Sequence, residues 1–184
     1  MSETLKTIET RFSCRGYDGR PIEIENVEAL AKAALQAPSA MNLQPWKIIA
    51  ITNKSLIDDM DMAAMEVATA MSDKSLYNRM LERGGKMYYN APCLFLVLKD
   101  ATSKWGDLDC GIVTQNIALA ATSLGLNNVI VATAAIPFSS PKGSEFKKRV
   151  NWPEGYEFGM GVCVGYGSIT KEPHEVDFDK VRYI

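Results

Sequence analysis

Apolar residues recur along this chain at two spacings, one typical of helices and one typical of strands. The helical spacing is clearest in residues 26–36, where Val27, Leu30 and Ala34 fall on one face. The pattern predicts helices at 2–10, 26–36, 54–71 (after an N-cap at Asn53), 75–83, 107–124 and 144–150. It predicts strands at 46–52, 92–98, 128–132 and 157–164.

Two of these segments are apolar on nearly every side. Residues 92–98 form a continuous apolar run, as expected of a strand with both faces covered. Residues 107–124 end at Gly125, a typical C-cap residue, and read as a central buried helix. The mixed order of elements predicts an α+β fold in one domain over residues 1–184. In that fold, helices cover both faces of a sheet of four or five strands.

The net charge and the hydropathy pattern argue against two classes of partner. The formal net charge of −2 gives no electrostatic basis for binding nucleic acid. No apolar run reaches the roughly 18–20 residues that a membrane-spanning helix needs. Residues 1–10 lack the apolar core of a signal peptide, so we expect a cytoplasmic protein.

The cysteines and the single histidine argue against metal and hydrolase chemistry. Cys14, Cys93, Cys110 and Cys163 are scattered and form no Cys-x-x-Cys pair, so no zinc or iron–sulfur site is expected. A Ser-His-Asp or Cys-His set would have to use His174, which lies in the charged C-terminal segment. Hydrolase chemistry is therefore disfavoured.

The segment 37–46 stands between a predicted helix and a predicted strand. Pro38 and Pro45 bracket it, and proline disfavours helix both at its own position and at the residue before it. We therefore expect a fixed, non-helical turn that presents Ser39, Asn42 and Gln44. Amide groups offer donors and acceptors that suit the polar edge of a planar ligand. The alternative is an ordinary polar surface turn. Trp46 starts the following strand, so we expect it in the core rather than stacked on the ligand.

Several segments taken together in chain order resemble the nitroreductase family of FMN-dependent oxidoreductases, from about Thr7 to Gly167. The most specific is the Pro-Ser-x-x-Asn-x-Gln-Pro-Trp block at 38–46. The others are Arg-x-Ser-x-Arg at 11–15, Asp-Cys-Gly at 109–111, the run 115–121, Leu-Gly-Leu at 124–126 and the segment 161–167. The resemblance implies an intimate homodimer with FMN at the subunit interface. It also implies that the C-terminal tail, about 172–184, packs on the partner subunit.

The resemblance also implies which residues hold FMN. Arg11 and Ser13 would bind its phosphate, and Arg15 would reach toward the ribityl chain and pyrimidine edge. All three side chains share one side if the backbone is extended, whereas only the arginines share a face in a helix. Without the resemblance, three solvated polar side chains are the alternative. The other implied cofactor residues are Pro38, Ser39, Asn42 (for the pyrimidine edge), Gln44, Ala132, Thr133 and Lys171.

Two of these positions depart from the family pattern. A backbone N–H after the strand 128–132 would donate to flavin N5, with Ala132 and Thr133 nearest. Several relatives have a proline and an acidic residue there, and this chain has neither. Lys171 is chosen as the basic residue after the Gly-Tyr-Gly strand end, because Pro173 and His174 stand where an arginine is expected.

Methionines are concentrated in the middle of the chain. Core packing is the first interpretation, because methionine fills irregular apolar gaps. A mobile lid over the flavin is the alternative. The residues concerned are Met60, Met62, Met65, Met71, Met80 and Met87.

The function implied by the resemblance is ping-pong hydride transfer, with no catalytic side chain. NAD(P)H would reduce the flavin at N5, and a small oxidised acceptor such as a nitroaromatic or a quinone would then reoxidise it. One alternative is an FMN-binding protein without turnover, used to store or sense flavin. A second is a scaffold protein that no longer binds flavin.

Overall fold

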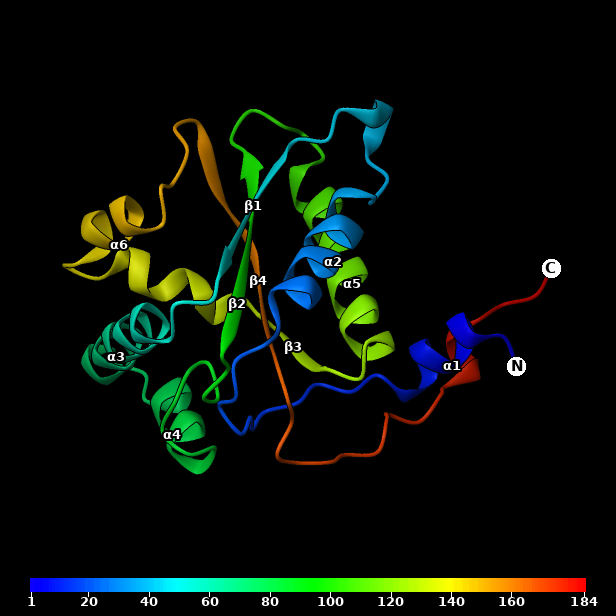
Figure 1. Ribbon diagram of the computed structural model, residues 1–184, viewed down its shortest axis with the longest axis horizontal. Coiled ribbons are helices and arrows are strands. Elements are labelled where there is room, and N and C mark those ends of the chain that lie inside the picture. Colours follow the sequence, from blue (N-terminus) through cyan, green and yellow to red (C-terminus); the bar gives the residue numbers. More distant parts are fainter.

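The computed structural model describes all 184 residues and places a four-stranded sheet at their centre (Figure 1). The strands are β1 (Trp46–Ile51), β2 (Cys93–Asp100), β3 (Asn127–Val131) and β4 (Tyr156–Gly165). They lie in the order β1-β2-β4-β3, and every neighbouring pair is antiparallel. All four strands were predicted, with ends that agree to within two residues.

Strand β2 is buried on both faces, as its continuous apolar run predicted. Leu94, Leu96 and Leu98 point into a core formed with α3 (Lys54–Ala70), α4 (Ser75–Glu82) and α6 (Gly143–Arg149). Cys93, Phe95 and Val97 point to the opposite face and pack with α2 (Ile24–Leu35) and α5 (Gly106–Ser123). This alternation follows from the two-residue period of a strand. Helices therefore cover both faces of the sheet (Figure 1).

Local capping explains several of the helix ends. The Asn53 side chain accepts a hydrogen bond from Leu56 N at 3.0 Å and starts α3 where predicted. Gly125 follows α5 with a φ of +74°, which L-residues rarely adopt, and so ends the helix. Helix α2 starts at Ile24, two residues earlier than predicted, and Glu23 precedes it with non-helical backbone at φ −59° and ψ 140°.

Besides a third in the C-terminal segment, two short 3-10 helices were not predicted from the sequence. Ala40–Asn42 makes one such turn, but Met41 and Asn42 have left-handed φ values of 51° and 55°, so the segment between Pro38 and Pro45 is not a regular helix, as expected. Residues Ala132–Ser139 form the second, directly after β3. Of the clustered methionines, Met60, Met80 and Met87 are buried in the core, whereas Met62 and Met71 are exposed.

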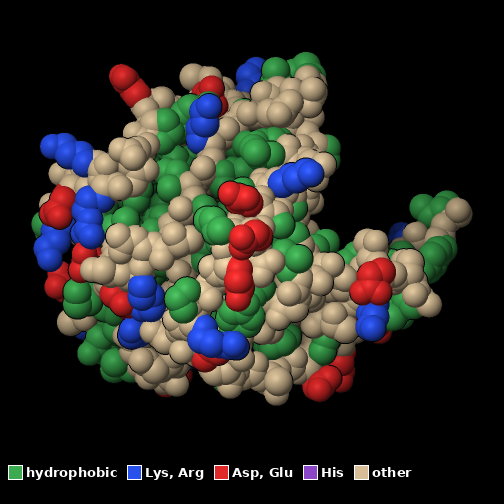
Figure 2. Space-filling model, viewed as in Figure 1, with side chains coloured by type: hydrophobic (Ala, Val, Ile, Leu, Met, Phe, Trp, Pro, Cys, Tyr) green, Lys and Arg blue, Asp and Glu red, His purple; other side chains and the backbone are tan.

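An arm projects from the body of the protein. It consists of α1 (Glu3–Thr10) and the C-terminal residues 172–184, which lie side by side (Figures 1 and 2). The C-terminal segment is extended except for the short 3-10 helix Phe178–Lys180. Apolar side chains such as Phe178 and Tyr183 are exposed on it. None of the helices is long and apolar enough to span a membrane.

Candidate functional site

The Arg-x-Ser-x-Arg segment is extended. It leaves α1 at Arg11 and runs beside β3, where Cys14 N donates to Asn128 O at 2.9 Å and Ser13 forms an isolated bridge with Asn128. Cys14 is fully buried, whereas Arg11, Ser13 and Arg15 are half-buried. Since side chains alternate along extended backbone, these three share the side opposite Cys14.

The two arginines carry charge that the chain does not neutralise. Neither Arg11 nor Arg15 belongs to any ion pair. Arg15 donates only to the Ser13 carbonyl, at 3.4 Å. Arg11 lines a hollow of about 1010 Å³ between α1 and the tail, together with Gln115 and His174. Two guanidinium groups and a hydroxyl on one side of a strand form a donor set that fits a phosphate dianion.

The segment after β4 packs against the arginine segment. Tyr17 pairs with Gly167, and Ser168 N donates to Gly16 O at 2.9 Å. A Cβ on Gly167 would lie 2.6 Å from the Asn127 side-chain oxygen, so only glycine fits there. The structure thus brings the N-terminal block and the Gly-Tyr-Gly block together. Lys171 follows four residues later and is exposed, so its contact with phosphate stays a prediction.

The turn at residues 39–44 is built from strained backbone. Met41, Asn42 and Gln44 have φ values of 51°, 55° and 48°, the left-handed region that non-glycine residues avoid. This costs about 1–2 kcal/mol for a residue such as Met41 or Gln44, whereas asparagine tolerates the region better. Hydrogen bonds inside the turn hold it: Ser39 Oγ accepts from Gln44 N at 2.9 Å, and Asn42 Oδ1 accepts from Gln44 Nε2 at 3.2 Å. Strain of this kind concentrates at functional sites.

A buried carboxylate fastens this turn to α5. Asp109 Oδ1 accepts a hydrogen bond from Ala40 N at 3.2 Å, and the Asp109 residue is 3% exposed. Its second oxygen, Oδ2, has no hydrogen-bond partner. Asp109 belongs to the Asp-Cys-Gly motif of the sequence, but no role was predicted for it. An acidic residue inside an otherwise apolar helix was the available signal.

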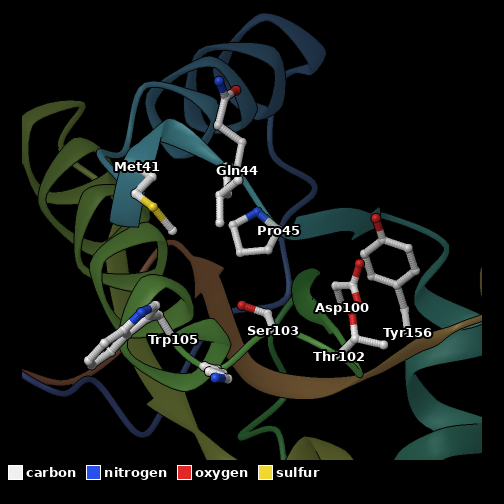
Figure 3. A pocket seen from close by; sticks show the side chains of 10 residues that line it. Met41, Gln44, Pro45, Asp100, Thr102, Ser103, Trp105 and Tyr156 are labelled. Carbon is white, nitrogen blue, oxygen red and sulfur yellow. Dashed lines mark hydrogen bonds between the residues drawn. The ribbon is translucent and has the colours of Figure 1, made fainter.

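A cavity of about 390 Å³ lies beside the turn (Figure 3). Met41 and Trp105 lie on one side of it, Pro45 lies near its centre, and Tyr156 lies on the opposite side (Figure 3). The Gln44 side chain points away from the cavity, although its residue contributes to the wall. Pro38 and Asn42 are exposed and Ser39 is half-buried, so the turn offers polar groups at the surface.

The arginine segment and the turn lie at opposite ends of the sheet. Pro45 O accepts from Asp100 N at 2.8 Å, and Asp100 pairs with Tyr156 at the start of β4. Ser13 lies beside Asn128, which pairs with Val164 near the end of β4. Eight strand residues at about 3.3 Å each separate these positions by about 26 Å. A single chain therefore does not gather the two blocks around one ligand.

The third predicted block lies at the end of β3. Val131 pairs with Gly161 of β4, and Ala132 and Thr133 open the 3-10 helix that follows. Ala132 is exposed and Thr133 is half-buried, so a ligand can approach their backbone. A Cβ on Gly161 would lie 2.5 Å from the Ala134 Cβ, so this glycine lets the 3-10 helix pack against the sheet.

Comparisons with known proteins agree with this architecture. Residues 8–166 match the model of the nitroreductase family. A nitroreductase with bound FMN from Desulfitobacterium hafniense DCB-2 is 44% identical, with a TM-score of 0.96 over 100% of this chain and 99% of the other. A nitroreductase with bound FMN from Bacteroides fragilis NCTC 9343 is 25% identical, with a TM-score of 0.90 over 100% of both chains.

A curated relative extends the match in sequence. A putative NADH dehydrogenase/NAD(P)H nitroreductase from Archaeoglobus fulgidus is 31% identical over 182 residues, which cover 96% of this chain and 92% of the relative. The family match spans most of the chain, and the sheet and helices superpose on solved nitroreductases over its full length. On these grounds the chain belongs to the nitroreductase family.

Proposed function

We propose that this protein is an FMN-dependent oxidoreductase that uses NAD(P)H to reduce small oxidised acceptors. The observation that carries the proposal is the extended segment 11–15, where two unpaired guanidinium groups and a hydroxyl face one side of the chain. Relatives crystallised with bound FMN support the choice of cofactor. Relatives named NAD(P)H nitroreductase support the choice of reductant.

The proposed cofactor contacts follow from the chemistry of each segment. Arg11 and Ser13 hold the FMN phosphate, because an arginine fork and a hydroxyl satisfy several of its oxygens at once. Arg15 reaches the ribityl chain and the pyrimidine edge. Asn42 presents an amide, which can donate and accept, to the same polar edge. Ala132 and Thr133 offer backbone N–H groups, and Lys171 offers a further cation for the phosphate.

Two copies of the chain are needed to assemble this site. The arginine segment and the turn are separated along the sheet. Each FMN is therefore bound by the arginine segment of one subunit and by the turn of its partner. A two-fold dimer forms two such sites at once, because each contact is repeated by symmetry. Exposed apolar side chains near the turn support an interface there: Met41 is 81% exposed, Leu43 59% and Leu108 of α5 64%.

The chain contributes binding and orientation, while bound FMN supplies hydride acceptance and donation. The cysteine thiols are poorly suited to act as nucleophiles in its place. All four cysteines are buried. Burial raises the pKa of the Cys93 thiol to about 12 and that of Cys163 well above its ordinary value. Neutral thiols are poor nucleophiles, which favours cofactor chemistry.

Steady-state kinetics with FMN-loaded protein test the proposal. NADH and NADPH are each varied against a nitroaromatic and a quinone, and oxidation of the nicotinamide is followed. We expect turnover with parallel double-reciprocal lines, because the nicotinamide leaves before the acceptor binds. Loaded protein that oxidises neither nicotinamide with any acceptor would instead support the flavin-storage alternative.

A further inference from the structure

The strained turn is joined to the rest of the fold by one hydrogen bond. The Ala40 N–H bond to Asp109 Oδ1 is the one hydrogen bond that links residues 38–44 to another part of the chain. The turn's other hydrogen bonds join its own residues. The side chains of Met41 and Leu43 are largely exposed, so packing adds little support. Between its two anchored ends, the turn is therefore tied to the fold through one buried carboxylate.

Stability alone does not explain an aspartate at this place. Asp109 is buried and its Oδ2 has no hydrogen-bond partner, and a buried carboxylate in this state is unfavourable. A leucine has the same branching at Cγ, with two methyl groups in place of the oxygens, and would carry no such penalty. The positive end of the α5 dipole favours acidic residues nearby. Asp107, which is exposed and paired with Lys99 Nζ at 2.8 Å, already meets that preference.

We propose that Asp109 is a positioning residue for the flavin site. It holds Ala40 and thereby keeps Met41, Asn42 and Gln44 in their left-handed conformations, while touching no ligand itself. Without an acceptor at Asp109, these three residues relax toward ordinary φ values and Asn42 leaves its place. This inference rests on the proposed function, because it assumes that the turn contacts FMN.

Three full-length variants separate the acceptor from the charge. Asp109→Leu removes the acceptor, and Asp109→Asn keeps the Oδ1 acceptor but removes the charge. Asp107→Leu is the matched control, since it changes an acidic residue in the same part of α5 that touches Lys99 and not the turn. Two readouts are measured on each protein: hydrogen–deuterium exchange of the peptide that covers residues 38–45, and FMN affinity by fluorescence titration.

For Asp109→Leu we expect about tenfold faster exchange confined to this peptide and about tenfold weaker FMN binding, which corresponds to one lost hydrogen bond. Asp109→Asn should restore both readouts, and Asp107→Leu should leave both unchanged. Rescue by asparagine is the signature of an acceptor, which a purely space-filling role would not produce.

The outcomes distinguish this inference from the proposed function. Unchanged exchange at 38–45 in Asp109→Leu overturns the positioning role. Faster exchange with unchanged FMN affinity shows that the turn does not bind flavin, which overturns the proposed use of the turn and the positioning role with it.

Asp109→Leu can fail to fold, so a variant on the other side of the contact is needed. Ala40→Pro removes the donor, and Ser39 already has the extended backbone that precedes proline, at φ −142° and ψ 160°. The same loss of FMN affinity is expected. Full affinity in Ala40→Pro would overturn the inference.

Discussion

Subunit complementation tests whether the flavin site is shared between two copies. One chain carries Arg11→Ala with Arg15→Ala, and the other carries Asn42→Tyr, which blocks the surface of the turn. Each removed charge-assisted contact should cost about 1.5–3 kcal/mol, so the double variant should lose at least about a hundredfold in FMN affinity. Each variant alone should therefore be a folded dimer without flavin.

Mixing the two variants should restore a fixed share of the sites. The substituted positions lie about 26 Å apart along β4 in one chain, so each site combines the arginine segment of one subunit with the turn of the other. In a mixed dimer, one site therefore carries both sets of substitutions and the other site carries none. Random reassociation of equal amounts gives about half mixed dimers, and hence FMN in about a quarter of all sites. The bound fraction is read from flavin absorbance after gel filtration of the reassociated protein.

Two results would refute the shared site. If one chain alone assembled the site, every site in the mixture would keep one lesion and no FMN would be recovered. A monomer that still binds FMN, measured by light scattering at low micromolar concentration, would contradict it as well. Circular dichroism of each variant controls for folding.

Three further predictions concern single residues. Arg11→Ala should weaken FMN binding roughly ten- to hundredfold. The control Arg83→Ala, which changes an exposed arginine at the end of α4, should leave the affinity unchanged. Equal FMN affinities of Arg11→Ala and the wild type in a fluorescence titration would show that Arg11 is not part of the site. Asn42→Asp should lower the midpoint potential of bound FMN by at least about 30 mV, because a carboxylate beside the pyrimidine edge disfavours the added negative charge of reduced flavin. An unchanged or higher midpoint potential, measured by spectroelectrochemistry, would contradict this. Burial raises the pKa of Asp61 above its ordinary 3.8, so the stability that Asp61 contributes falls as the pH rises from 3.8 through the raised value. Asp61→Asn keeps an acceptor for Tyr88 N but does not titrate, so the urea midpoint of the variant should rise relative to that of the wild type from acidic to neutral buffer. A difference in midpoint that stays constant with pH would refute the reasoning.

Much of the fold was predictable because its signals are local. The continuous apolar run of β2 indicated a strand covered on both faces, and its side chains do alternate between two cores. Asn53 and Gly125 fixed the start of α3 and the end of α5 through their own backbone and side-chain chemistry. Such features need no knowledge of distant residues.

The shape of the turn was not predictable in the same way. In a sequence, glycine is the usual indication of left-handed backbone, but here Met41, Asn42 and Gln44 adopt it. Their conformation depends on Asp109, which lies 69 residues from Ala40 in sequence. The separation of the turn from the arginine segment likewise follows from the strand order, which no local pattern encodes. The candidate residues were therefore predictable as a set, while their division between two ends of the sheet was not.

The visible spectrum of the purified protein, recorded under anaerobic conditions before and after each nicotinamide is added, tests the central claim most directly. A flavin oxidoreductase should be yellow, or become yellow when FMN is added, and the flavin absorbance should bleach rapidly with NADH or NADPH and return with a nitroaromatic or a quinone. A yellow protein that neither nicotinamide bleaches would contradict the oxidoreductase function. A colourless protein that ignores added FMN would contradict the flavin site itself.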